Sequence, residues 1–535
     1  MAIARWKPRQ TYTKAEEWIM RRLGRTRKLF AFLRAHRHAL FDDAFQGEWK
    51  SRYRDTGADK PPVPPARLAR VTLWPAYLKV SDAEAVELSV RDRRGQLVLD
   101  CGEATEPPFS QGALEEFRAR LIRTDMDRRR LERTVEGARQ SKAFDARQRP
   151  KTVRVAFAAR ALEGAGRGED TLNLVGHAAR KRVAGGAVLL GCSVDEVARQ
   201  AGSPVVLAPS LKAGLDVEWT DPQAPAAARQ RLVHQIEALA AWGQRPLPQA
   251  LPQDSLREHV APLPQGQAQA LEPLPASQGV RLRQGVAPAR RCASEDPEMR
   301  HGRKSKPKRF TGYKRHGATE RDDDLILACA VPPANHPEDE AAEPLTADLD
   351  HPELGPIDEL YIDRGSLSSP VVSAILKAGG TVLCRPWGVS NGEVVSKQAF
   401  KLKLRDKTLT CPGGHPEAFR RGTVGEFPAA ECDRCPVRAQ CTPAAPGRGR
   451  TVTIGEDEPF QHRLRQRAAT RAGRAQLRQR VAGEPRLAQL GARQGRRARD
   501  KGVRKNLFEV RRTAAVLTLQ TMQRKTQEQE WGMAA

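Results

Sequence analysis

The sequence has no uninterrupted run of apolar residues long enough to cross a membrane. A membrane-spanning helix needs roughly 20 consecutive, mostly apolar residues, so a helical integral membrane protein is excluded. Charged residues also interrupt the N-terminal region, at residues 20–25, before the apolar core of a secretory signal peptide could form. We therefore expect a cytoplasmic protein.

The sequence also lacks the pattern of a disulfide framework. Nine cysteines are spread over 535 residues, and a cytosolic chain of this length is not held together by disulfide bonds. Five of them stand alone in the sequence and are expected to be small buried residues: Cys101, Cys192, Cys292, Cys329 and Cys384. The other four fall within residues 411–441.

Acidic residues are too few to balance the basic ones. The chain has 91 Lys plus Arg against 64 Asp plus Glu, a net charge of +27 and a pI near 10.2. Such an excess favours a polyanionic partner, most simply nucleic acid, although a GC-rich genome also raises the arginine content. The excess is local, because residues 461–512 contain seventeen basic residues and three acidic ones. A uniform compositional bias does not explain that distribution.

A chain of this length is too long for a single hydrophobic core, so several folded units are expected. Apolar spacing predicts helices from residue 61 onwards, with Ser81 and Ser110 as N-caps, and a helix from Ser110 that continues into residues 118–133. We place a helical N-terminal domain at residues 1–145, a helical insertion at 165–245 and a linker rich in Pro and Gln at 245–290.

Between and after these segments the pattern changes to short strands. Residues 152–158, 310–316, 325–331 and 381–384 are predicted strands, and residues 371–378 a helix. Asp363 ends a further short apolar strand. This order predicts a mixed α/β core, which we place at residues 150–400.

Two acids stand out against the basic background. Asp363 follows an apolar strand and precedes Arg364 and Gly365, while Glu484 lies in the Arg-rich segment about a hundred residues further on. Carboxylates hold divalent cations, and surrounding positive charge holds a polyanion, so the pair indicates metal-assisted phosphodiester chemistry. The alternatives are a turn residue for Asp363 and a solvated helix residue for Glu484.

Cys411, Cys432, Cys435 and Cys441 are separated by 20, 2 and 5 residues. A Cys-x-x-Cys knuckle with two flanking thiolates has the ligands of a tetrahedral structural Zn²⁺ site, so residues 401–450 are predicted to be a small zinc-ribbon-like insert. His415 is an alternative ligand. Two further interpretations of these cysteines are thiols that bind no metal and thiols with a redox role.

Several motifs carry a resemblance to a known family. They are the four-cysteine stretch and the segments 296–300, 312–316, 331–335, 362–365 and 495–508. In this order they resemble bacterial insertion-sequence transposases of the DDE type, over roughly residues 41–524. The resemblance implies a ribonuclease-H-like catalytic core, an N-terminal domain that binds DNA and a C-terminal part of the core, residues 451–524, that carries the third acid.

The resemblance also implies an activity. Such an enzyme binds the inverted-repeat ends of its element, cuts a strand with two Mg²⁺ (or Mn²⁺) ions and joins the freed end to target DNA. Asp363 matches the family's second catalytic acid and Glu484 the third. The implied partners are double-stranded DNA and, on paired ends, a second copy of the chain. The implied location is the bacterial cytoplasm, in association with the nucleoid.

The chain departs from the family at three places. Ala158 occupies the position of the first catalytic aspartate, and a methyl group cannot coordinate a metal; Glu163 and Asp296 are the candidates to replace it. Pro485 follows Glu484, so that acid must lie at a helix start or a kink. Ser366 replaces a tyrosine. These changes predict a decayed or impaired copy, and a DNA-binding relic without catalysis is the alternative function.

Basic residues of the same motifs are expected to contact DNA phosphates. His301 to Arg309 form a further cationic loop, and the arginines of residues 463–480 are expected to surround a helix, unless they are only a solvated face. The candidates are Lys314, Arg315, His316, Arg364, Arg496, Arg497, Arg499, Arg504 and Lys505. For His316 a structural role inside the fold is the alternative.

Overall fold

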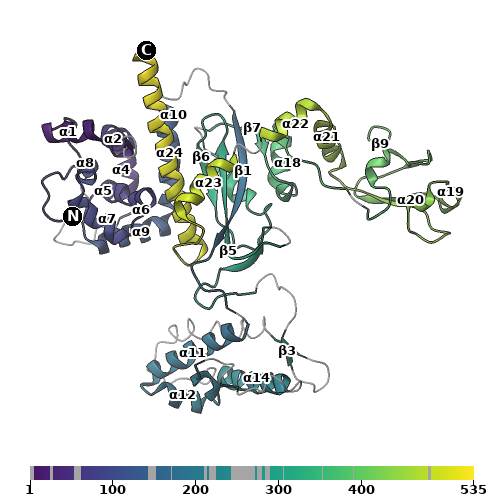
Figure 1. Cartoon of the computed structure of the whole chain (residues 1–535), viewed down its shortest axis with the longest axis horizontal. Helices are drawn as coiled ribbons and strands as arrows, with labels where there is room; N and C mark the ends of the chain where they lie inside the picture. The colour runs from purple at the N-terminus through teal and green to yellow at the C-terminus, as the bar shows by residue number, and fades with distance from the viewer. Residues whose placement is uncertain are drawn as a thin grey trace.

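A mixed six-stranded sheet forms the centre of the protein (Figure 1). The computed structural model describes residues 5–23, 28–53, 62–141, 152–169, 171–209, 214–215, 224–242, 271–273, 280–282, 290–304, 307–351, 354–389, 391–479 and 483–534. The strand order is β4-β5-β1-β7-β8, with β6 also paired to β5. The strands are β1 (Val153–Glu163), β4 (Arg300–Arg303), β5 (Arg309–Glu320), β6 (Ile326–Ala330), β7 (Ile357–Tyr361) and β8 (Thr381–Leu383). The predicted α/β class is confirmed.

Strand β1 lies in the middle of the sheet and is longer than the sequence pattern predicts. It pairs antiparallel with β5 from Val155, opposite Glu320, to Glu163, opposite Gly312. On its other side it runs parallel to β7. The run of alternating small and charged residues after residue 158 is weak evidence for a strand, but the ladder to β5 satisfies its backbone groups and extends it.

Helices cover the sheet and form the N-terminal segment. Ser81 and Ser110 cap α7 and α9 as predicted, because their hydroxyls accept the N–H groups of Glu84 at 3.1 Å and Ala113 at 3.2 Å. The N-terminal helices are α1 (Lys14–Arg22), α2 (Lys28–Ala35), α3 (Arg37–Leu40), α4 (Asp43–Lys50), α5 (Pro65–Val71), α6 (Trp74–Leu78), α7 (Asp82–Arg91), α8 (Arg93–Leu99), α9 (Gln111–Thr124) and α10 (Met126–Gln140). The helices next to the sheet are α17 (Ala342–Leu349), α18 (Pro370–Lys377), α21 (Glu458–Ala469), α22 (Arg471–Arg478), α23 (Gly483–Gln494) and α24 (Val503–Ala534).

The single helix expected after Ser110 is in fact two, because the chain breaks at Asp125. This residue has φ 55°, in the left-handed region, and separates α9 from α10. The break brings the Asp125 carboxylate to 2.6 Å from the Arg511 guanidinium on α24. The N-terminal helices are thereby tied to the last helix of the chain.

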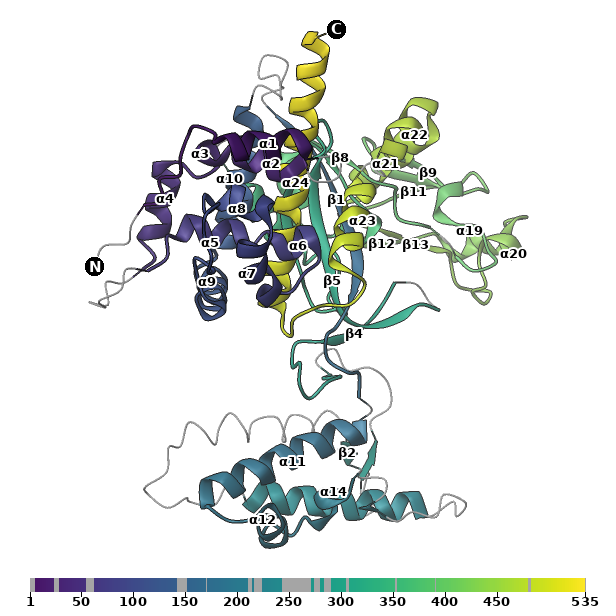
Figure 2. The same cartoon turned by 60° about the vertical axis from the view of Figure 1, so that its left-hand side comes forward.

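A second helical unit extends from the far end of β1. It contains α11 (Thr171–Leu190), α12 (Val194–Gln200), the short 3₁₀ helix η2 (Pro204–Leu207) and α14 (Ala224–Trp242), within the helical block predicted from the sequence. Its apolar residues form a core of their own, and both views show it apart from the sheet (Figures 1 and 2). Of the predicted linker at 245–290, the structure describes Arg290 and two short paired strands, β2 (Leu271–Pro273) and β3 (Val280–Leu282).

The segment from residue 391 to 454 is a small unit of short elements. Three strands pair antiparallel in the order β11-β10-β9, and β12 pairs with β13. The elements are β9 (Lys401–Lys403), β10 (Thr408–Thr410), β11 (Pro416–Ala418), β12 (Thr423–Glu426), α19 (Ala429–Asp433), α20 (Arg438–Cys441) and β13 (Thr451–Ile454). None of the helices in the described part of the chain has the length and apolar character to cross a membrane.

Candidate active site and nucleic-acid interface

The sheet register brings the first two acid positions of the predicted site together. Ala156 of β1 is paired with Tyr361 of the parallel strand β7. Two residues further along each chain lie Ala158 and Asp363, so the expected first and second positions are neighbours at one level of the sheet. Both residues line the same cavity of about 330 Å³.

Helix α23 brings the third position to this cavity. A methyl group on Gly483 would lie 2.9 Å from Cβ of Ala156, so the helix start packs closely against β1. Glu484 follows and lines the cavity. Pro485 lies in the first turn of α23, where its missing N–H breaks no helical hydrogen bond. The prediction that Glu484 lies at a helix start is confirmed.

The cavity also contains residues that the sequence motifs did not single out. Glu338 lines it together with Asp363 and Glu484, and its Oε2 would lie only 2.7 Å from a Cβ added at Gly365. The close approach explains why a glycine follows Asp363 and Arg364. Glu338 comes three residues after the 331–335 motif, but only the fold shows that this loop reaches Asp363. Basic residues complete the lining: Arg160, Arg303, Lys304 and Lys314.

The oxygen donors in this cavity are of the kind that Mg²⁺ and Mn²⁺ prefer. Among the described residues, however, no group of three or more His, Cys, Asp or Glu side chains is arranged so that it could hold a metal ion. The position that should supply a further carboxylate is the methyl group of Ala158. The carboxylate oxygens are therefore the right kind of ligand for a divalent cation, but there are too few of them in a suitable arrangement.

Neither candidate replacement for the missing aspartate reaches the cavity. Asp296 is fully buried, and its Oδ1 accepts a hydrogen bond of 2.5 Å from the hydroxyl of Tyr313. Glu163 is at the far end of β1, where its carboxylate lies 2.7 Å from the guanidinium of Arg496. The lining of the cavity, as the structure describes it, includes neither acid. In this structure neither Asp296 nor Glu163 is placed to substitute for the first acid.

Two of the predicted DNA contacts point into the protein. Arg315 is buried, and its guanidinium donates to Oε1 of Gln494 at 2.9 Å and to the carbonyl oxygen of Gly495 at 3.0 Å. His316 is also buried. In a strand, neighbouring residues face opposite sides, and here α23 covers one side while the core covers the other. Arg315 and His316 are therefore internal residues and not part of an exposed basic surface.

The burial of His316 predicts a pH dependence of stability. Desolvation, with a smaller effect of Lys314, lowers the pKa of His316 to about 3, whereas an unfolded histidine has a pKa of about 6.5. Above that value the residue is neutral in both states; as the pH falls, the unfolded chain takes up the proton first. We expect His316 to cost about 1.4 kcal/mol of stability per pH unit below 6.5.

Urea unfolding at about pH 7 and about pH 5 tests this for the wild type and for His316→Gln. The variant should lose less stability between the two pH values, whatever its stability at the higher pH. Equal losses in the two proteins would show that His316 is protonated in the folded state or that it is not buried.

The remaining predicted DNA contacts differ in exposure. Arg364, Arg499 and Lys505 are exposed, as are Arg496 and Arg497. Arg497 donates to the carbonyl oxygen of Gly164 at 3.0 Å, which fixes it beside the end of β1. Lys314 is half-buried and lines the cavity, with its Nζ 2.8 Å from the carbonyl oxygen of His336.

Arg504 is the exception among these basic residues. Its guanidinium pairs with Asp127, which is completely buried, and lies 3.1 Å from Asp125. A phosphate would have to compete with two carboxylates for this side chain. Arg504 therefore links α24 to α10, and its contact with DNA stays a prediction.

The arginines of α21 and α22 do not all face solvent. Arg463, Arg471, Arg474 and Arg478 are exposed, in agreement with a basic surface. Arg467 instead donates to the carbonyl oxygen of Val382 at 3.3 Å, and Arg465 pairs with the buried Glu458. Arg480, which also belongs to this series, lies outside the described residues. The series predicted to surround much of a helix is thus divided between two helices, with four of its six described arginines exposed.

Part of the cationic loop 301–309 is strand. Arg303 at the end of β4 pairs with Arg309 at the start of β5. The turn between them carries Lys304, and both Arg303 and Lys304 line the cavity. Residues 305 and 306 lie outside the described part of the chain.

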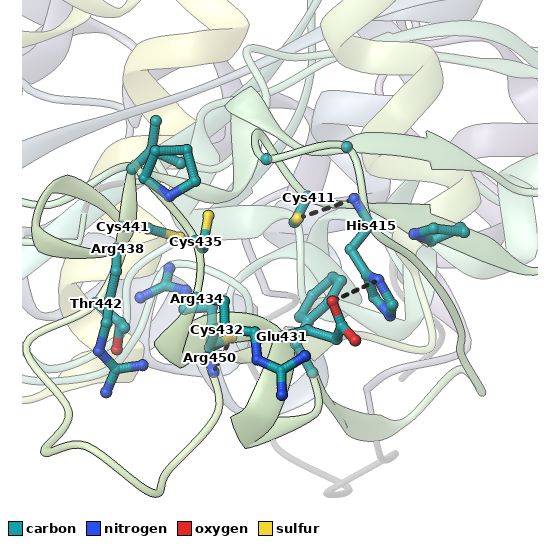
Figure 3. Close-up of a pocket in the computed structure, with 16 residues that line it drawn as sticks. Cys411, His415, Glu431, Cys432, Arg434, Cys435, Arg438, Cys441, Thr442 and Arg450 are labelled. Carbon is teal, nitrogen blue, oxygen red and sulfur yellow. Dashed lines mark hydrogen bonds and ion pairs between the residues drawn. The ribbon is translucent and has the colours of Figure 1, made fainter.

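The four clustered cysteines line a separate cavity, shown in Figure 3. Cys411 follows β10, Cys432 lies in α19, Cys435 follows that helix and Cys441 ends α20. None of the nine cysteines forms a disulfide. The sequence grouping is thus also a spatial grouping.

A mixed α/β sheet whose acids and basic side chains meet in one cavity is typical of enzymes that act on phosphodiesters. Residues 411–523 match the family model of the transposase DDE domain. This match supports a DDE-type transposase, the family that the motifs predict. The matched region contains Glu484 and the four clustered cysteines, whereas Ala158 and Asp363 precede it. No curated protein and no solved structure matches the chain.

Proposed function

We propose that this protein binds the inverted-repeat ends of an insertion sequence and belongs to the enzymes that cut and transfer DNA strands with divalent metal ions. One observation carries the proposal. The register of β1 and β7 and the packing of α23 bring Ala158, Asp363 and Glu484 to one cavity lined by basic residues. These are the three positions that the family resemblance assigns to catalytic acids.

The strand order supports a ribonuclease-H-like core. Such a core has three antiparallel strands followed by two parallel strands, and here β6, β5 and β1 are antiparallel while β1, β7 and β8 are parallel. We propose the core at residues 150–400 and 451–524, interrupted by the helical unit at 165–245 and the four-cysteine insert at 401–450. The N-terminal helices, residues 1–145, are proposed to bind DNA.

Each group in the cavity has a proposed task. Asp363 and Glu484 would hold divalent ions, and bound ions would activate the attacking oxygen and stabilise the leaving oxygen. Arg160, Arg303, Lys304 and Lys314 would hold the phosphates on either side of the reacting bond. Glu338 is a carboxylate in the same cavity that could supply a further oxygen donor.

Ala158 limits what this copy can do. A methyl group replaces a carboxylate at the position next to Asp363, and Glu338 approaches from the other side of that residue, near Gly365. Two ions would therefore be held with fewer oxygen ligands than the chemistry needs. We propose that the protein as written binds DNA ends and cuts them poorly. The second candidate is a relic that binds ends without any cleavage and competes with an intact enzyme.

DNA binding can be tested without cleavage. We expect the full-length protein, without added Mg²⁺ or Mn²⁺, to bind duplexes that carry the repeat ends flanking its own gene more tightly than shuffled duplexes of equal length. Arg499→Glu and Lys505→Glu should each weaken binding to both duplexes and lower the slope of log K against log salt by about 1, because each removes one phosphate contact. Titration of fluorescent duplexes at several salt concentrations gives both quantities.

Lys403→Glu is the matched control, because Lys403 is an exposed lysine on β9 of the four-cysteine unit to which no DNA contact is assigned. It should leave the salt slope unchanged. If the wild type does not prefer repeat ends, or if all three variants have the same salt slope, recognition of the ends through Arg499 and Lys505 is refuted. Binding stoichiometry on paired and single ends would show whether a dimer forms.

A further inference from the structure

The unit at residues 391–454 has a very small hydrophobic core. The buried core residues within it are Phe400, Leu409, Phe419, Phe427, Cys441, Val452 and Ile454. Its strands are three or four residues long and its two helices five and four residues. A unit of this size and core usually needs a disulfide or a metal to be stable. A disulfide is absent from the described cysteines.

The four thiols lie where a cross-link would join the parts of this unit. A Cβ added at Gly413 would be 2.7 Å from Sγ of Cys435 and 3.6 Å from Sγ of Cys411, so these two sulfurs approach the same residue. The two cysteines come from the β10 turn and from the segment between α19 and α20. Cys411, Cys432 and Cys441 also belong to, or pack against, the small core.

Backbone groups already donate to two of the sulfurs. The N–H of His415 donates to Sγ of Cys411 at 3.3 Å, and the N–H of Arg450 donates to Sγ of Cys432 at 3.4 Å. Such bonds stabilise the thiolate form, which is the form that binds a metal. The turn at Cys411 is closed by the N–H of Gly414 and the turn at Cys432 by the N–H of Cys435, which hold both backbones in place.

Four thiolates around one cavity would repel one another, and a bound cation would remove that repulsion. His415 is less suited as a ligand, because its Nε2 lies 3.1 Å from the Glu417 carboxylate and its Nδ1 3.8 Å from that of Glu431.

We propose that Cys411, Cys432, Cys435 and Cys441 bind one Zn²⁺ ion that cross-links the 391–454 unit. Four soft sulfur ligands select Zn²⁺ over Mg²⁺ or Ca²⁺, and a closed site without an open position is structural, not catalytic. As the described side chains stand, they do not form a closed metal site. The sulfurs would have to turn toward the centre of the cavity that all four already line.

The test uses the full-length protein purified without chelators. We expect about one zinc per chain by elemental analysis, and replacement with Co²⁺ should give the visible absorption of a tetrahedral all-thiolate site. Cys432→Ser and Cys435→Ser should each lose the metal and become much more sensitive to protease within residues 391–454. Cys384→Ser, at a buried cysteine outside the cluster, should keep the metal.

Two other outcomes would overturn the proposal. If the native protein contains no zinc, does not take up Co²⁺ and all four thiols react at once with a thiol reagent, the cysteines bind no metal. If an oxidised form of the protein has two fewer reactive thiols among these four cysteines, and reduction restores them, those two cysteines have a redox role instead. Neither readout involves DNA. The zinc proposal can therefore be refuted while the proposed function stands, and the proposed function can be refuted while the zinc proposal stands.

Discussion

Ala158→Asp should create or strongly raise metal-dependent cleavage at the repeat ends. The new carboxylate would stand beside Asp363 at the level of the sheet where Glu484 also lies, and would supply the missing oxygen ligand. Metal ions contribute several kcal/mol of transition-state stabilisation, which corresponds to roughly a hundredfold or more in rate. Cleavage of end-labelled DNA with Mg²⁺ or Mn²⁺ measures the effect.

The site has room for the larger side chain. Ala158 is paired with Gly317 of β5, so no side chain stands directly opposite it in the sheet. The nearest neighbour of that glycine is Leu487, whose Cδ1 would be 3.4 Å from an added Cβ. Ala158 itself faces the cavity. We therefore expect Ala158→Asp to fold as the wild type does.

Ala158→Asn is the matched control, because it has nearly the same shape and no charge. It should not raise cleavage, and Asp363→Asn should abolish whatever activity Ala158→Asp gains. The affinity of the protein for Mn²⁺ without DNA, measured by calorimetry, is a second readout. This affinity should increase only in Ala158→Asp. If the wild type already cuts as fast as Ala158→Asp, the loss of the first acid has not impaired this copy.

Arg511→Met should destabilise the junction between the N-terminal helices and the core by about 3 kcal/mol, because it removes the buried cation that Asp127 and Asp348 share and leaves them only Arg504 and Arg128. The guanidinium of Arg511 lies 3.0 Å from Asp348 on α17, 3.4 Å from Asp127 on α10 and 2.6 Å from Asp125. The side chains of Arg511, Asp127 and Asp348 are less than a tenth exposed. Hydrogen exchange of amides in α10 and α24 measures the loss.

The pH dependence of this defect has a defined sign. Burial, opposed by Arg511 and Arg128, raises the pKa of Asp348, and removal of Arg511 should raise it further. The Asp348 carboxylate of the variant then binds a proton more tightly in the folded state than in the unfolded state, so the stability deficit should shrink as the pH falls. Arg91→Met, which breaks an exposed pair with Glu87, should change exchange little. Equal effects of both substitutions would refute the buried network as the source of stability.

Local sequence patterns predicted the elements whose formation depends on residues close together in the sequence. The caps at Ser81 and Ser110, helix α18, strand β8 and the helix start at Glu484 depend on side chains within a few residues of one another. The same patterns predicted a single helix, but Asp125 separates two helices. Its left-handed backbone accompanies an ion pair with Arg511 on a distant helix, which the local sequence does not show.

Burial of basic residues could not be predicted from the sequence. Arg315 and His316 occupy motif positions that suggest DNA contacts, yet α23 and the core of the sheet enclose them, and Arg504 is half-buried beside Asp127. Glu338 was missed for the opposite reason. Its segment carries no acid motif, and it reaches Asp363 only because the loop after β6 folds over the end of β7.

The sequence alone indicated a DDE-type transposase, the α/β class, the basic character and the candidates for the second and third acids, because each of these depends on residue type and order. The tertiary structure decided which of those residues meet. Strand pairing and helix packing join segments more than a hundred residues apart, and only they show that Ala158 stands beside Asp363, that Glu484 lines the same cavity and that two expected DNA contacts, Arg315 and His316, are internal.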